Sequence, residues 1–341
     1  MLFKNKKTLS IDFDTRSVKI VEASFKKDRL NIYDTFTIDL PEGTYEDGYI
    51  IDPGLLRDTL DSFLRLNEVK REDASVVLNS TDILTREIVL PNVTDEEVDG
   101  ILKYQINDYI PIDVDEYVVQ YLDQGVFMEE GNEKRKLFIS AMPKEIVVSF
   151  LDLLADLDFK PKVLDFKSNA IRKLVDYNID SIGKETVAVV DIGYTNTSLS
   201  ILKEGYIEVS RTLILGIREV LDRGELNSSE EERMEELLSL EESDIVKEGL
   251  ENSLEDFLRS LFEQLDMVFR YYNSAEVNNS IDLIFVQGDI VKLKKVEEMF
   301  EEYLSIETTS IDSLDEEMEE ELYLYGTAIG AILRGGRKWK I

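Results

Sequence analysis

The sequence contains no cysteine and no histidine among its 341 residues. Without thiol and imidazole groups, the chain has no disulfide, no cysteine or histidine catalyst, and none of the ligands that zinc prefers. Metal chemistry is therefore restricted to hard cations that bind carboxylate and other oxygen ligands. The absence of cysteine does not by itself identify the cellular compartment.

Positive charge is also scarce, with 39 basic against 72 acidic residues and a net charge of −33. This balance disfavours nucleic acid and anionic lipid as partners of the body of the protein.

Long hydrophobic runs are missing as well. Residues 1–7 lack the apolar core of a secretory signal, and the least polar run, 322–333, is shorter than the roughly 20 residues that cross a bilayer. We therefore expect a cytoplasmic protein.

The most informative stretch is a hairpin at residues 186–202. Residues 187–190 form a continuous apolar run, which predicts a buried strand, and Asp191 opens the turn that follows. Alternating apolar residues at 197–202 predict the second strand. Three residues of the turn suit a phosphate site, because they offer a bare backbone or polar donors: Gly193, Thr195 and Asn196. An ordinary turn of an α/β protein would have the same residues.

The same arrangement occurs near the N-terminus, where residues 8–21 read as strand, turn and strand with Asp12 in the place of Asp191. A third alternating segment follows each copy, at 30–40 and at 206–213. This repetition predicts a duplicated lobe with a cleft between the copies. Facing carboxylates in such a cleft suit a divalent cation on the phosphates of a nucleotide.

A small α+β module is predicted between the repeats. Thr94 and Glu97 form a capping box that opens a helix. The elements expected here are a strand at 83–90, a helix at 95–110, strands at 114–126 and 136–141, and a helix at 144–157.

The order of these motifs resembles the actin-like ATPase superfamily, and within it the chain is similar to the PilM family of type IV pilus assembly proteins. The superfamily resemblance rests on three segments, at the two phosphate positions and the adenosine position: residues 11–19, 190–197 and 285–289. The closer similarity rests on four runs in and beside the inserted module: residues 85–91, 109–112, 139–141 and 163–166. Together they cover roughly residues 8–335.

This resemblance implies a two-lobed actin-like fold, a duplicated ribonuclease H-like α/β architecture with an inserted α+β subdomain. The first lobe would comprise residues 1–81, 163–183 and a helix at 320–335, the insertion 82–162 and the second lobe 184–319. It also implies a cytoplasmic scaffold, peripheral to the cytoplasmic membrane, that binds the cytoplasmic tail of PilN and the pilus assembly ATPases.

The implied cofactors are ATP and Mg²⁺. Asp12 and Asp191 would hold the metal, Lys19 would neutralise charge, and Gly288 would pass under the adenosine. The residues expected to cradle the phosphates are Thr15, Ser17, Gly193, Thr195 and Asn196. Two of these positions have simpler explanations, since Lys19 can be an exposed strand lysine and Asp12 an acid that caps a turn.

Two positions depart from the family pattern. Asp14 stands where the first phosphate loop normally has glycine, and Asp289 stands where the adenosine loop has its second glycine. A carboxylate against phosphate oxygens is unfavourable unless a cation neutralises it. Either the cleft is degenerate in a retained fold, or both aspartates point outward and ATP still binds. The altered loops favour a protein without catalytic activity.

Other hypotheses remain at this stage. An ATP-binding division protein of the FtsA type, or a sugar-kinase-like enzyme, would share the fold. The acid-rich segment at 225–256 predicts a solvated helical insertion, or a surface for a basic partner. The basic cluster at 334–340 predicts a solubilising tail, or a position beside the membrane with a spanning segment beyond it.

Overall fold

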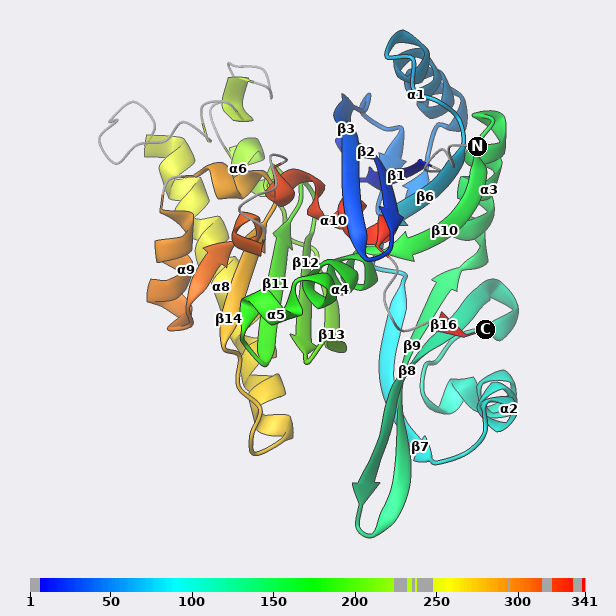
Figure 1. Ribbon diagram of the computed structural model, residues 1–341. Helices are drawn as coiled ribbons and strands as arrows, with labels where there is room; N and C mark the ends of the chain where they lie inside the picture. Colours follow the sequence, from blue (N-terminus) through cyan, green and yellow to red (C-terminus); the bar gives the residue numbers. More distant parts are fainter. Residues whose placement is uncertain are drawn as a thin grey trace.

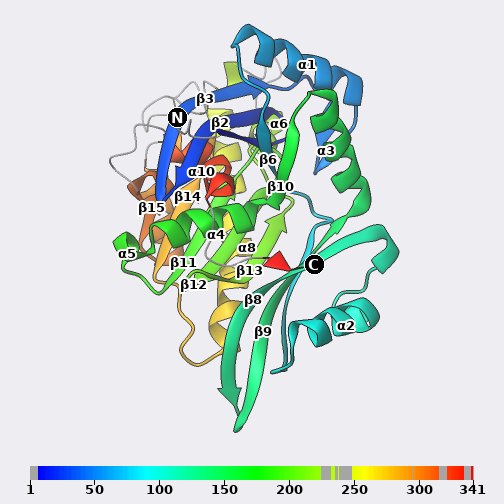
Figure 2. The same cartoon turned by 45° about the vertical axis from the view of Figure 1, so that its right-hand side comes forward.

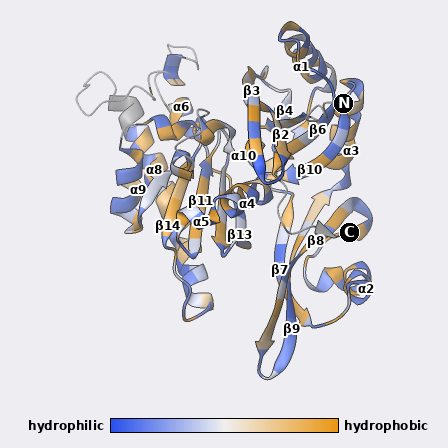
Figure 3. Cartoon of the chain, in the orientation of Figure 1, coloured by the Kyte–Doolittle hydropathy of each residue, from blue (hydrophilic) through white to orange (hydrophobic). Residues whose placement is uncertain are grey.

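The computed structural model of the chain describes residues 7–223, 232–234, 237, 248–293, 295–314, 321–333 and 339–340. Two five-stranded mixed sheets stand side by side with helices between and around them, and a four-stranded sheet extends below the first (Figure 1). Hydrophobic residues concentrate along the strands of both large sheets (Figure 3). The predicted α/β class and the repeated unit are confirmed.

The first sheet has the strand order β10-β6-β1-β2-β3. Its strands are β1 (Thr8–Phe13), β2 (Ser17–Lys26), β3 (Arg29–Asp39), β6 (Asp73–Leu78) and β10 (Lys160–Phe166). The first three strands form an antiparallel meander, whereas β6 and β10 run parallel to β1. All of β1 after its first residue is buried, as expected for a strand with both faces covered.

The second sheet repeats this topology in the order β13-β12-β11-β14-β15. Its strands are β11 (Thr186–Ile192), β12 (Thr197–Lys203), β13 (Tyr206–Leu213), β14 (Leu283–Gln287) and β15 (Thr308–Ser310). Asp12 and Asp191 hold equivalent places, since each lies in the first strand and pairs with an antiparallel and a parallel neighbour.

Helices α4 (Lys167–Tyr177) and α10 (Leu322–Ile332) pack against each other near the junction of the two large sheets. Their contact is close: a side-chain carbon at Gly330 would lie 2.1 Å from the carbonyl oxygen of Ala170. Glycine at this position of α10 therefore permits the two helices to pack tightly.

The inserted sheet has the order β16-β8-β9-β7. It comprises β7 (Leu84–Pro91), β8 (Tyr117–Glu129), β9 (Asn132–Pro143) and β16 (Trp339–Lys340), and α2 (Asp95–Gln105) supplies a separate core with it. The capping box of Thr94 and Glu97 is present. Near the C-terminus the chain returns to this sheet, and β16 pairs with β8 (Figure 2).

Three details differ from the sequence-based expectations. The helix after Thr94 ends at Gln105 and continues only as a short 3-10 turn (Ile106–Asp108), so it does not reach residue 110. Strands β8 and β9 extend to a tight turn at Glu130 and Gly131, since both residues adopt the left-handed conformation that such turns need. Helix α3 (Lys144–Asp156) packs into the core of the first sheet.

The remaining elements cover the two large sheets. They are β4 (Tyr45–Glu46), β5 (Tyr49–Ile50), α1 (Pro53–Leu66), α5 (Ile179–Ile182), α6 (Arg218–Arg223), α8 (Glu248–Ala275) and α9 (Val296–Leu304). Most of the acidic segment at 225–256 and of the basic cluster at 334–340 lies outside the described residues. Among the helices that the structure describes, none combines the length and apolarity that a membrane crossing requires.

Candidate functional site

The two predicted phosphate turns meet directly between the sheets. The hydroxyl oxygens of Thr15 and Thr195 lie 2.9 Å apart, one from each hairpin. The guanidinium of Arg16 lies over the ring of Tyr194, 5.6 Å from its centre. The structure therefore brings the predicted turns together, with side chains in contact across the gap.

A buried lysine lies among the aspartates of this cleft. The Lys167 ammonium donates to Asp191 Oδ2 at 3.0 Å, and Asp14 Oδ2 lies 3.8 Å from the same nitrogen. Burial by itself would lower the pKa of Lys167, but the carboxylates of Asp191, Asp14 and Asp12 outweigh it and raise that pKa above its ordinary value. The lysine therefore carries its charge at neutral pH.

Asp12 is the most enclosed of the three carboxylates. It is 4% exposed, and its Oδ1 accepts no hydrogen bond from the described residues. Burial raises the pKa of Asp12 to about 7, against the lowering effect of Lys167 and of Lys19 across the strand pair. Asp12 therefore holds a proton near neutrality more readily than an exposed carboxyl does.

The carboxylate of Asp14 lies against the glycine of the second turn. A side-chain carbon added to Gly193 would lie only 2.9 Å from Asp14 Oδ2, so the Asp14 carboxylate points into the place beside the glycine. Within the described part of the chain, no three acidic side chains are arranged to hold a metal ion. The residues between the turns do not fit a Mg²⁺-bound phosphate group in this arrangement.

The loop after β14 has a structural reason for its glycine. Gly288 adopts a φ of +99°, and a side-chain carbon there would lie 2.2 Å from the carbonyl oxygen of Ile192. The side chain of Asp289 beside it is 43% exposed and pairs with Lys292 at 3.3 Å. Of the two departures from the family pattern, Asp289 thus points outward and Asp14 points inward.

Two residues that the sequence analysis missed join the sheets here. Lys167 follows β10, and Asn79 follows β6. The Asn79 side chain bonds three residues of the second sheet and its hairpin at 2.8–3.0 Å: Asn196, Ser198 and Thr212. Both missed residues follow the carboxyl ends of parallel strands, where side chains of neighbouring strands converge. This position in the chain is the feature by which the sequence could have identified them.

The remaining predicted residues lie on the same hairpins. Ser17 and Lys19 are partly buried on β2, and Asn196 accepts the Asn79 amide. The assignment of the nine residues to ATP, and of Asp12 and Asp191 to Mg²⁺, stays a prediction.

A second candidate site is a cavity of about 840 Å³ between the first sheet and the inserted sheet. Strand β10 and helix α4 form one side, β8 and β9 the other, and the last residues of α10 close one end. Cavities of this size at the junction of two structural units are typical binding sites.

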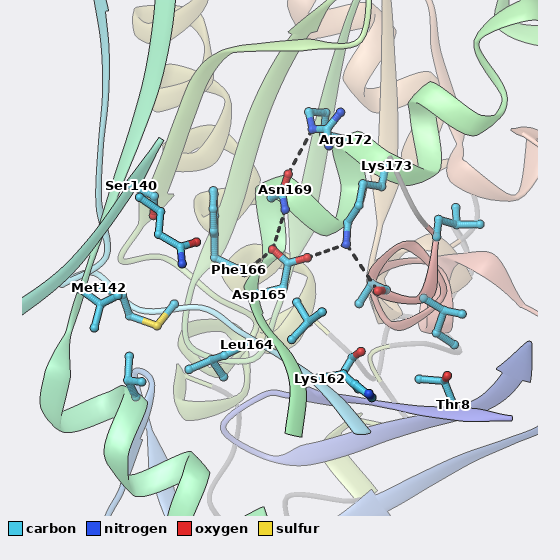
Figure 4. Close-up of a pocket in the computed structure, with 18 of the residues that line it drawn as sticks. Thr8, Ser140, Met142, Lys162, Leu164, Asp165, Phe166, Asn169, Arg172 and Lys173 are labelled. Carbon is cyan, nitrogen blue, oxygen red and sulfur yellow. Dashed lines mark hydrogen bonds and ion pairs between the residues drawn. The ribbon is translucent and has the colours of Figure 1, made fainter. Parts of the chain in front are cut away.

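The polar part of the cavity is a connected network on β10 and α4 (Figure 4). Asp165 accepts from Asn169 at 2.8 Å and pairs with Lys173 at 2.7 Å, and Arg172 donates to Asn169 at 3.1 Å. Each of these four side chains is more than 90% buried. Their mutual bonds fix the floor of the cavity in one arrangement.

Apolar side chains complete the walls. Those from the first sheet are Val163, Leu164 and Phe166, and those from α3 and the inserted sheet are Val147, Val118 and Met142. Val163 is 41% exposed, so part of this wall is open to solvent. The cavity thus combines apolar walls with a fixed polar floor, a combination that is usual in ligand-binding sites.

Comparison with known proteins identifies the family. The model of the family described as type IV pilus assembly protein PilM matches residues 10–322. A solved structure described as the PilM-PilN type IV pilus biogenesis complex matches with 18% identity and a TM-score of 0.80, over 97% of this chain and 98% of that one.

More distant structures share the actin-like fold. Ethanolamine utilization protein EutJ from Carboxydothermus hydrogenoformans matches with 13% identity and a TM-score of 0.54, over 97% of this chain and 91% of its own. MreB5 of Spiroplasma citri bound to AMPPNP matches with 12% identity and a TM-score of 0.53, over 96% and 95%. The chain belongs to the PilM family of type IV pilus assembly proteins, within the actin-like ATPase fold.

Proposed function

We propose that this protein is a scaffold of type IV pilus assembly that binds an extended peptide, the cytoplasmic tail of a PilN-like protein, in the cavity between the first sheet and the inserted sheet. The observation that carries this proposal is the cavity itself, with its apolar walls and fixed polar floor. The family match supplies the pathway, and the solved PilM-PilN complex supplies the class of partner.

The charges of the cavity favour binding over catalysis. Lys173 pairs with Asp165, and Lys162 lies 3.3 Å from Asp73. Groups that are already paired in this way position a ligand through hydrogen bonds and apolar contact, and they do not supply a free acid or base. Hydrogen bonds and apolar contacts of this kind are sufficient for a scaffold that only binds its partner.

The strand pairing around the cavity favours an extended ligand. β10 is the end strand of the first sheet, and its residues 162–166 line the cavity, where Gln120 and Ser140 of the inserted sheet offer further polar groups. An extended peptide satisfies its backbone on such groups and places alternate side chains against the apolar walls.

The wider assignment follows the family. We include in the proposal a cytoplasmic location, an indirect association with the cytoplasmic membrane through the PilN-like partner, and contact with the pilus assembly ATPases. The match to the PilM family favours this role over a division protein of the FtsA type.

The test is binding of a fluorescent peptide with the sequence of the partner's cytoplasmic tail, followed by anisotropy. Val163→Asp places a charge on the open part of the apolar wall, and we expect at least a tenfold loss of affinity, about 1.4 kcal/mol. Val148→Asp is the matched control, because Val148 is 53% exposed and lies outside the cavity lining. Equal affinity of the two variants would reject the cavity as the peptide site.

A further inference from the structure

The cation between the two hairpins is part of the chain. Lys167 is the first residue of α4, directly after β10, and its side chain is 6% exposed. Its ammonium nitrogen lies 3.0 Å from Asp191 Oδ2 and 3.8 Å from Asp14 Oδ2. A buried ammonium is stable only where carboxylates compensate the loss of water, and these two aspartates provide that compensation.

We propose that Lys167 takes the place of a divalent cation in this protein, so that the cleft is a metal-free joint that holds the two sheets together. The joint includes groups from both sides: Lys167 and Asp14 follow strands of the first sheet, and Asp191 belongs to β11 of the second.

The position of Lys167 opposes a divalent ion. Mg²⁺ binds carboxylate oxygens at about 2.1 Å. An ion bound to Asp191 Oδ2 would therefore lie within roughly 5 Å of the ammonium nitrogen, since that nitrogen is 3.0 Å from the same oxygen. Two cations this close in a buried site repel each other strongly. A metal could enter only if Lys167 moved out of its ion pair.

The groups that would contact a phosphate are occupied as well. The Asp14 carboxylate lies against Gly193, where a phosphate would need the bare backbone. Thr15 and Thr195 bond to each other, and Asn79 ties the first sheet to Asn196. These groups make with one another the contacts that they would otherwise offer to a nucleotide.

A further pair of bonds extends the joint along α4. Ser168 bonds to Ser210 and accepts from Ser200, each at 2.8 Å. Both partners lie in the second sheet, so the start of α4 is fixed to that sheet by a charge and by two hydroxyl contacts. A joint of this kind predicts two lobes that keep their relative position without a bound ligand.

The experiment is a Mn²⁺ titration of the wild-type protein, with and without ATP, followed by the electron paramagnetic resonance signal of free Mn²⁺. Because ATP itself binds Mn²⁺, each titration is compared with a protein-free blank at the same ATP concentration, and we expect no stoichiometric uptake by the protein beyond that blank. Stoichiometric uptake that Asp191→Asn abolishes would overturn the proposal.

A second measurement tests the replacement directly. Lys167→Met leaves the carboxylates without their cation, so we expect the melting temperature to fall by roughly 10 °C in metal-free buffer and Mn²⁺ to restore most of it. Lys173→Met is the matched control, because Lys173 is buried and paired with Asp165 on the same helix, away from this cleft. The control should lose stability that Mn²⁺ does not restore. If Mn²⁺ did not raise the melting temperature of the Lys167→Met protein, the proposal would be contradicted.

Discussion

The hydroxyl groups of Thr15 and Thr195 are hydrogen-bonded at 2.9 Å, although 180 positions separate the two residues in the chain. Each is in the turn of one of the two equivalent hairpins. Because the turns touch, the halves of the duplicated fold are linked at the two turns for which the sequence predicts phosphate binding. The link is made of short polar side chains.

Replacing both threonines by valine removes this link and keeps the side-chain shape. In a double-mutant cycle of Thr15→Val and Thr195→Val, we expect a coupling energy of about 1 kcal/mol, because the two hydroxyls bond to each other. Urea unfolding of the four proteins measures it. Strict additivity would mean that the turns separate in solution.

Gly288→Ala tests whether the glycine of the adenosine loop serves the fold. The new side-chain carbon would lie 2.2 Å from the carbonyl oxygen of Ile192, so we expect a loss of about 3 kcal/mol of unfolding free energy in nucleotide-free buffer.

Gly183→Ala is the control for this substitution. Gly183 also has a positive φ, of +61°, but a side-chain carbon there meets nothing within 4 Å. The Gly183→Ala protein should lose about 1 kcal/mol of unfolding free energy, which is the cost of the left-handed conformation alone. Should Gly288→Ala be as stable as the wild type without nucleotide, the packing explanation would fail.

The pH dependence of stability should reflect Glu87. Lys136 bridges Glu87 of β7 at 2.8 Å and Glu208 of β13 at 3.0 Å, and so joins the inserted sheet to the second sheet. Burial raises the pKa of Glu87 above its ordinary value of 4.5, against the lowering effect of Lys136. The folded protein therefore holds this proton more tightly than the unfolded chain does.

The sign of the effect follows from this difference. The contribution of Glu87 to stability is complete below pH 4.5, and it is lost as the pH rises through the raised pKa of the folded state. Glu87→Gln should flatten that part of a plot of unfolding free energy against pH. Glu96→Gln, on the exposed face of α2, should leave the curve unchanged. A wild-type curve that rises across this range, with no change in Glu87→Gln, would count against the assignment.

The pairing of β16 with β8 predicts protection of the edge of the inserted sheet. Trp339 pairs with Leu122, and Lys340 with Tyr121. Deleting residues 339–341 should speed amide hydrogen exchange around residues 121–122, because strand edges without a partner exchange faster. Exchange in β11, at the centre of the second sheet, serves as the internal control. Unchanged exchange at 121–122 would show that β16 does not pair there in solution.

Local patterns in the sequence were sufficient for most of the fold. Alternating and continuous apolar runs predicted the strands of both hairpins, because strand periodicity is visible within a few residues. The capping box at Thr94 predicted the start of α2 for the same reason. The end of α2 was predicted less well, because the pattern of apolar residues continues into the 3-10 turn at Ile106–Asp108.

The two candidate sites could be predicted from the sequence to different degrees. The repeat predicted that Asp12 and Asp191 hold equivalent places, which the strand pairing confirms. It did not reveal the cavity of about 840 Å³, because that surface is assembled from β10, α4 and the inserted sheet and has no contiguous motif.

The sequence by itself determined the duplicated hairpins, the inserted module, the strongly acidic charge and the absence of thiol and imidazole chemistry, because each depends on residue type or on spacing along the chain. Only the tertiary structure decided that Asp14 points inward and Asp289 outward, and that Lys167 lies between the aspartates. These outcomes depend on where distant strands end and on which side chains lose their water, and Coulomb pairing in a buried site then selects the partners.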